Sequence, residues 1–108
     1  MPENLLFELP PEIEACDTVV IYDERSGAIR HTHNVFTWRG ATHPTREEIE
    51  KEAMEEARRA GVELRGVATL RIDPREVEAD ALHRVDVRER RLVASRVRRG
   101  RGRARPTG

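Results

Sequence analysis

Two alternating runs of apolar and polar residues within residues 19–38, joined by a short turn sequence, constrain the fold of this chain most. The first run covers residues 19–22 and, together with Thr18 before it, consists of β-branched and aromatic residues; the second run covers residues 28–38. Between them, Asp23 can accept hydrogen bonds from its own turn, and Gly27 can take the positive φ that a type I turn with a bulge requires. The sequence therefore predicts an antiparallel β-hairpin.

The second run carries two histidines, and its faces follow from strand geometry. Alternate residues of a strand point to the same side, so His31 and His33 are expected on one face with Ile29 and Val35. A bulge near Asn34 is an alternative that would move the aromatic residues of the opposite face to the core beside Ile29. Those aromatic residues are Phe36 and Trp38.

The histidine pair is a candidate metal site. His31 and His33 could hold a divalent cation, with His43 as a third ligand from the loop after the hairpin. Around a threefold axis, three such pairs would supply six nitrogens to one octahedral ion, an arrangement that His-x-His pairs adopt in some phage fibre and spike proteins. The competing interpretation is an exposed polar strand face. We therefore expect a metal only in a trimer or a higher ring.

Residues 1–17 are predicted to form an extended apolar arm. Pro10 and Pro11 exclude a continuous helix or a central strand in this segment. Such an arm docks either on its own domain or on a neighbouring subunit. Its candidate partner-binding side chains are Leu5, Leu6, Phe7 and Leu9, to which the hairpin adds Trp38.

A helix is predicted between Thr45 and Gly61. Thr45 can cap its first turn, and Glu48, three residues later, completes a capping box. The apolar residues of this segment form a narrow stripe of mostly small side chains, which favours close packing on a flat surface such as the sheet. The stripe consists of Ile49, Ala53, Ala57 and Ala60, with Met54 at its edge.

A third strand and a second hairpin are predicted after the helix. Residues 67–72 favour a strand, and residues 82–87 and 91–97 favour a hairpin. Asp86 is expected to open the turn of this hairpin, as Asp23 does in the first. The elements together predict an α+β fold of antiparallel hairpins with one helix packed on the sheet.

Length and composition indicate one small domain with a thin core. The chain has 108 residues, close to the commonest domain size, and we assign the α+β domain to residues 18–95. Large apolar side chains are scarce, so we expect stability to be gained by self-association or by complex formation. Arg supplies 19 of the 20 basic residues, a composition typical of thermophiles or of high-GC genomes.

Charge is divided unevenly along the chain. Residues 1–64 hold 14 acidic and 7 basic residues, whereas residues 65–108 hold 6 acidic and 13 basic residues. Residues 96–108 contain no acidic residue and are predicted to form a disordered tail. This tail could neutralise nucleic-acid phosphates or bind an acidic protein surface. Its arginines are Arg96, Arg98, Arg99, Arg101, Arg103 and Arg105.

No catalytic signature stands out in the sequence. Phosphate loops, nucleophile elbows and paired cysteines are missing, and nothing near Cys16 would lower the pKa of its thiol, which favours a packing role. No apolar run approaches the roughly 18 residues of a membrane span. We therefore expect a non-enzymatic protein without a membrane partner, located in the cytoplasm or, if phage-encoded, in the virion.

An aromatic residue, an aspartate, a short spacer, a serine, a glycine and an apolar residue follow one another in residues 20–29. This run resembles the hairpin that opens many small phage and prophage tail-associated structural proteins. It is also similar to the Tyr-Asp repeat of large secreted toxin shells, but it has an extra turn residue and occurs once. Either resemblance implies a structural subunit that binds copies of itself or its neighbours. The alternative is a nucleic-acid-binding accessory protein that acts through the arginine tail.

Overall fold

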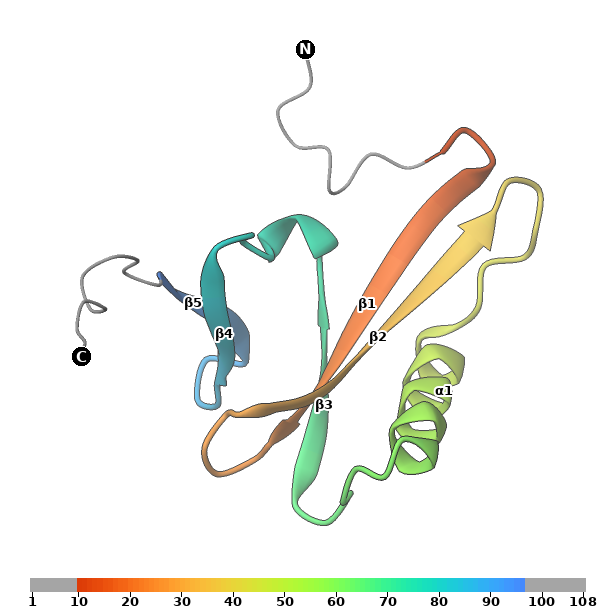
Figure 1. Ribbon diagram of the computed structural model, residues 1–108. Helices are drawn as coiled ribbons and strands as arrows, with labels where there is room; N and C mark the ends of the chain where they lie inside the picture. Colours follow the sequence, from red (N-terminus) through yellow and green to blue (C-terminus); the bar gives the residue numbers. More distant parts are fainter. Residues whose placement is uncertain (1–9, 97–108) are drawn as a thin grey trace, which may run out of the picture.

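The computed structural model describes residues 10–96, which form five strands, one α-helix and one short 3-10 helix (Figure 1). This content and its antiparallel pairing confirm the predicted α+β class. In chain order the elements are β1 (Ile13–Asp23), β2 (Ile29–Trp38), α1 (Arg46–Arg59), β3 (Val67–Ile72), the 3-10 helix η2 (Pro74–Glu76), β4 (Ala81–Asp86) and β5 (Arg91–Arg96).

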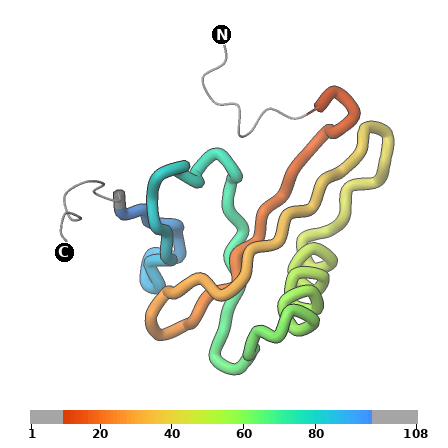
Figure 2. The backbone as a smooth tube through the Cα atoms, viewed as in Figure 1, coloured from red at the N-terminus to blue at the C-terminus, as the bar shows by residue number. Residues whose placement is uncertain are grey.

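The strands form two sheets. β1 lies between β2 and β3 in a three-stranded antiparallel sheet, and β4 and β5 form a separate two-stranded hairpin. The backbone trace shows α1 on one side of the larger sheet and the β4–β5 hairpin on the other (Figure 2). The second hairpin is therefore a covering layer of its own and does not extend the sheet.

β1 is buried on both faces and separates two apolar clusters. Val19 and Ile21 face α1, where they pack against the small-residue stripe of the helix. Val20 and Tyr22 face the β4–β5 hairpin and pack against Val85. The buried members of the stripe are Ile49, Ala53 and Ala57. Each fully buried aliphatic or aromatic side chain contributes about 1.5–3 kcal/mol, so this strand is the centre of the core.

The helix begins as predicted. The hydroxyl of Thr45 accepts a hydrogen bond from the backbone N–H of Glu48, and the Glu48 carboxylate accepts one from the Thr45 N–H, which completes the capping box. Ala60 departs from the prediction, because it is the exposed C-cap residue and not part of the buried stripe. Gly61 follows with a φ of +88° and ends the helix.

The first strand begins earlier than predicted. β1 starts at Ile13 and not near residue 18, so the last five residues assigned to the arm belong to the sheet. Glu14 and Asp17 obscured this in the sequence, because acidic residues are uncommon in strands. Pairing of residues 13–17 with β2 and an ion pair of Asp17 with Arg71 accommodate them.

One residue of β2, Ile29, lies on the opposite face of the sheet from the one predicted. His31 and His33 lie opposite Ile21 and Val19, so they share the face of the sheet that meets α1. Ile29, however, pairs with Tyr22 and packs in the opposite cluster. The reason is a bulge that leaves the residue between Ile29 and His31 unpaired, which reverses the alternation at that point. The bulge in β2 is therefore at Arg30 and not near Asn34.

Both hairpin turns use an aspartate as predicted. The Asp23 carboxylate accepts hydrogen bonds from the backbone N–H groups of the two residues that follow Glu24, and Asp86 accepts the equivalent pair in the second hairpin. Gly27 has a φ of +81°. Its carbonyl oxygen also accepts a hydrogen bond of 2.8 Å from the Val85 N–H, so the first turn anchors the second hairpin.

Candidate functional site

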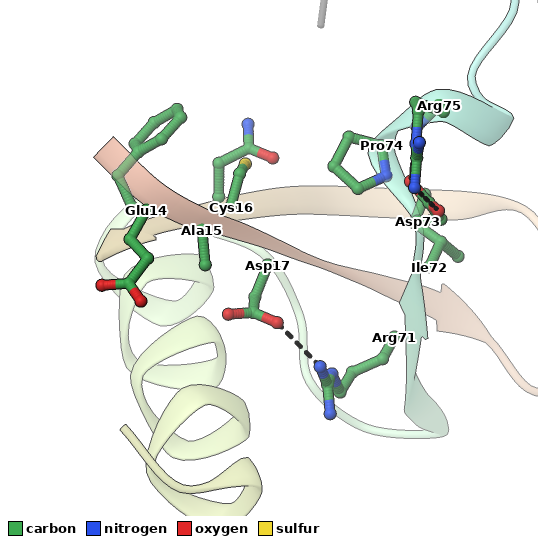
Figure 3. Close-up of a pocket in the computed structure, with 11 residues that line it drawn as sticks. Glu14, Ala15, Cys16, Asp17, Arg71, Ile72, Asp73, Pro74 and Arg75 are labelled. Atoms are coloured by element: carbon green, nitrogen blue, oxygen red, sulfur yellow. Dashed lines mark hydrogen bonds and ion pairs between the residues drawn. The ribbon is translucent and has the colours of Figure 1, made fainter. Parts of the chain in front are cut away.

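A hollow opens where β1 and β3 diverge. β3 pairs with residues 18–23 of β1, and among residues 10–96 no strand pairs with residues 13–17 on the same side. We call this unpaired side of residues 13–17 the open edge of β1. The hollow beside it has a volume of about 790 Å³ and is lined by residues of β1, β2, β3 and η2 (Figure 3). Six of them are Cys16, Asp17, Phe36, Arg71, Asp73 and Arg75.

A buried carboxylate forms the polar wall of the hollow. Asp17, with a side chain only 10% exposed, accepts a hydrogen bond of 2.7 Å from the Arg71 guanidinium, drawn as the lower dashed line in Figure 3. It also lies 2.8 Å from Nε2 of His43, in the loop between β2 and α1. Asp17 thereby links β1, β3 and this loop. A buried carboxylate requires such partners because desolvation disfavours its charge.

The geometry of His43 indicates a structural role for this cluster. Its Nδ1 lies 2.8 Å from the Pro44 carbonyl oxygen, and its Nε2 faces the Asp17 carboxylate. The ring therefore bridges a backbone carbonyl oxygen of its own loop and a carboxylate of β1. The arrangement holds the loop against the sheet.

Cys16 lies on the opposite side of β1 from Asp17 and is half-buried. Burial raises the pKa of the Cys16 thiol above its ordinary value, a hydrogen bond with Thr18 opposes this rise, and the charge of Asp17 adds to it. The neutral thiol therefore predominates near neutral pH, and a neutral thiol is a poor nucleophile. This environment agrees with the packing role expected from the sequence.

Four side chains form an apolar surface at the far end of the β1–β2 hairpin. Ile13 is directly opposite Trp38, and Cys16 is directly opposite Phe36, so each pair points to one side of the sheet. The Phe36 and Trp38 residues are 49% and 58% exposed. We call Ile13, Cys16, Phe36 and Trp38 the aromatic face. Of the predicted partner-binding residues, Trp38 lies here.

Of the three histidines predicted to bind metal, His33 and His43 have different partners. The His33 side chain is 14% exposed, and its Nε2 is 3.9 Å from a carboxylate oxygen of Glu52 on α1. His43 instead contacts Asp17. Within residues 10–96, no group of three or more His, Cys, Asp or Glu side chains is placed to hold a metal ion. A metal at His31 and His33 in an oligomer stays a prediction.

The remaining predicted site residues lie at or beyond the limits of the described chain. Arg96 is the last residue of β5. The apolar side chains of the arm and the other tail arginines lie outside the described residues. They are Leu5, Leu6, Phe7 and Leu9, and Arg98, Arg99, Arg101, Arg103 and Arg105.

The comparisons with known proteins give no relative. No family model, no curated protein and no solved structure matches the chain. Within the described residues, none of the helical segments has the length and apolar character needed to cross a membrane. A functional proposal must therefore rest on the aromatic face, the hollow and the charge distribution.

Proposed function

We propose that this chain is a non-enzymatic assembly subunit that binds copies of itself or a neighbouring subunit through the aromatic face. The observation that supports this most is the exposure of Phe36 and Trp38 side by side on one face of β2. Aromatic side chains are enriched in the centres of protein interfaces, where they supply much of the binding energy. In a chain with so few aromatic residues, two at one surface indicate a partner.

The thin core supports the same proposal. The fully buried apolar residues of the described chain are few, and three of them belong to the single helix. A domain of this size buries only about two-thirds of its unfolded surface. Burial of the aromatic face in an interface would add to this small apolar core. In its most specific form, the proposal is that the chain is a small virion or tail protein. This form is supported by the resemblance of residues 20–29 to the hairpin of small phage and prophage tail-associated structural proteins.

The test is the mass of the protein in solution. We expect light scattering to show a defined oligomer at roughly tens of micromolar chain, and a Phe36→Ser, Trp38→Ser double variant to be monomeric. Leu82→Ser is the matched control, because Leu82 is also exposed, at 69%, but lies on β4 outside this face. A folded wild-type monomer would contradict the proposal. A monomer that carries nucleic acid, seen as a high 260/280 nm absorbance ratio, would favour the alternative of binding through the arginine tail.

A further inference from the structure

The side of β2 away from β1 is the longest free strand edge of residues 10–96. β2 has ten residues and stands at the end of the sheet order β2-β1-β3, so no strand of the described chain pairs with it on this side. We call this side the outer edge of β2. Its unpaired backbone N–H and carbonyl groups are a template for another strand.

The outer edge of β2 lacks the side chains that normally protect such an edge. Although 37% of the chain is charged, residues 31–38 contain no Asp, Glu, Lys, Arg or Pro, whereas natural edge strands are blunted by charges and by proline. The arginines at the two ends of this segment are engaged on the β1 side. Arg30 pairs with Asp23 at 3.0 Å, and the Arg39 guanidinium donates to the Pro11 carbonyl oxygen at 2.8 and 3.0 Å. The outer edge is therefore open to pairing.

The other free edges are less suited to pairing with a second copy. On β3, the Arg90 guanidinium donates a hydrogen bond of 3.3 Å to the Thr69 carbonyl oxygen. The open edge of β1 has a bulge at Glu14 and a second carboxylate at Asp17, and like charges directly opposite each other destabilise a strand pair. β4 and β5 are only six residues long, and both carry arginines.

We infer that the outer edge of β2 pairs antiparallel with the same edge of a second copy, about a twofold axis perpendicular to the sheet. The two sheets then form one continuous sheet of order β3-β1-β2-β2-β1-β3. This inference rests on the proposed function, because it names the way in which two copies meet at the aromatic face.

The ends of β2 determine the register of this pairing. The bulge is at Arg30 and the strand ends at Trp38, so residues 32–38 are the longest segment that includes Trp38 and is symmetrical about one residue, Val35. Phe36 is then directly opposite Asn34 of the second copy. The two Phe36 side chains become diagonal neighbours on one face, a separation that aromatic side chains can span.

A second copy fits the outer edge of β2 better than a charged strand of another protein. A twofold contact brings the same surface together from both copies, and residues 31–38 leave no opposite charge that a charged strand could pair with. The same contact buries part of Phe36 and Trp38, which are 49% and 58% exposed. Backbone hydrogen bonds and aromatic burial thus act at one interface.

Amide hydrogen exchange of the wild-type protein, resolved by residue, tests the pairing. Successive residues of β2 direct their N–H groups alternately to β1 and to the outer edge. We expect the N–H groups of the outer edge to exchange roughly tenfold more slowly when the chain concentration is raised until the dimer predominates. The N–H groups on the free side of β3 are the matched control and should exchange at an unchanged rate.

Disulfide formation between two variants tests the register. Asn34→Cys and Phe36→Cys are made with Cys16→Ser and mixed, so that the new thiols are on opposite residues, within the Cα separation of about 4.4–6.8 Å that a disulfide requires. In either variant alone the thiols would be diagonal, about 7–8 Å apart. We expect the mixture to give a disulfide-linked heterodimer, with the loss of two hydrogens by mass spectrometry, roughly tenfold faster than either variant forms its homodimer. Leu82→Cys mixed with Phe36→Cys is the control, because Leu82 is exposed on β4.

The outcomes separate this inference from the proposed function. A folded wild-type monomer would contradict both. An oligomer in which the N–H groups of the outer edge of β2 exchange equally fast at all concentrations would overturn only the edge pairing, as would a trimer or equal disulfide rates in the test and control mixtures. If the cysteine variants are monomeric, hydrogen exchange of the wild-type protein decides.

Discussion

At the scale of single residues, aspartates organise the connections of this fold. The backbone N–H groups of Ser26 and then Arg25, together with the Arg30 side chain, lower the pKa of Asp23 to about 2. The backbone N–H of Glu89 lowers the pKa of Asp86 in the same way. These hydrogen bonds favour the ionised carboxylate. The turns are therefore held best when both carboxylates are charged.

The low pKa of Asp23 predicts a loss of stability in acid. The pKa of Asp23 is lower in the folded chain than the ordinary value of about 3.9. Its contribution to the free energy of unfolding is therefore complete above about pH 4 and is lost as the pH falls towards about 2. We expect the melting temperature, followed by circular dichroism, to fall over this range. The fall should be smaller in Asp23→Asn, which keeps an acceptor oxygen but cannot titrate. Glu24→Gln is the control, and equal pH profiles for Asp23→Asn and wild type would contradict the prediction.

The residue scale also shows what sequence patterns can and cannot predict. The roles of Asp23, Asp86 and Thr45 were predicted because each acts on backbone groups within three residues of itself. The contacts of Asp17 were not predicted, since its partners are 26 and 54 residues away. The sequence shows only that Asp17 precedes the strongly apolar residues 18–22. This position implies that the carboxylate has a partner but does not identify the partner.

At the scale of elements, local sequence patterns predicted whether a segment forms a helix or a strand. The residues at which a strand begins and ends depend on its pairing with other strands. The helix and both hairpins follow from caps, periodicity and turn residues. The start of β1 at Ile13 and the face of Ile29 depend instead on the register with β2, which includes two irregular positions. Likewise, nothing in residues 82–97 indicated that the second hairpin would form a separate layer. That arrangement depends on its contact with Gly27 and on the cluster around Tyr22.

The contact between the two hairpins predicts that Gly27 tolerates no side chain. Gly27 has a φ of +81°, and a Cβ there would overlap the backbone carbonyl of Val85. Strain and overpacking together should make Gly27→Ala less stable by roughly 2–4 kcal/mol in urea unfolding. Gly40→Ala is the control, because it has a similar positive φ of +87° but open space around it. A loss no larger than that of the control would show that the contact with Val85 contributes nothing.

At the scale of the whole molecule, the described part of the basic half includes the β4–β5 hairpin. Arg96 pairs with Ala81 as the last residue of β5, so this residue of the expected tail belongs to the second hairpin, and the rest of the expected tail lies outside the described residues. Among the described residues, Arg71 of the basic half forms an ion pair with Asp17 of the acidic half. Electrostatic binding through the tail stays a prediction.

Deletion of residues 97–108 tests this prediction. We expect the truncated protein to keep its melting temperature, because β5 ends at Arg96. Its affinity for a duplex DNA probe, measured by fluorescence anisotropy, should fall and become less dependent on salt, with the slope of log K against log salt reduced by roughly 0.9 for each lost phosphate contact. An unchanged slope would show that the tail does not contact phosphates. Unfolding of the truncated protein would show that the tail is part of the domain.

The burial of β1 on both faces has a consequence for how this sequence can vary. Insertion or deletion of one residue between Val19 and Tyr22 would turn the side chains beyond it to the opposite face, so that Tyr22 would meet the small alanines of α1. Neither cluster could accommodate the exchange. Relatives of this protein should therefore keep a constant spacing within this strand, and changes of length should occur at the two bulges, beside Glu14 and Arg30, where the register already shifts.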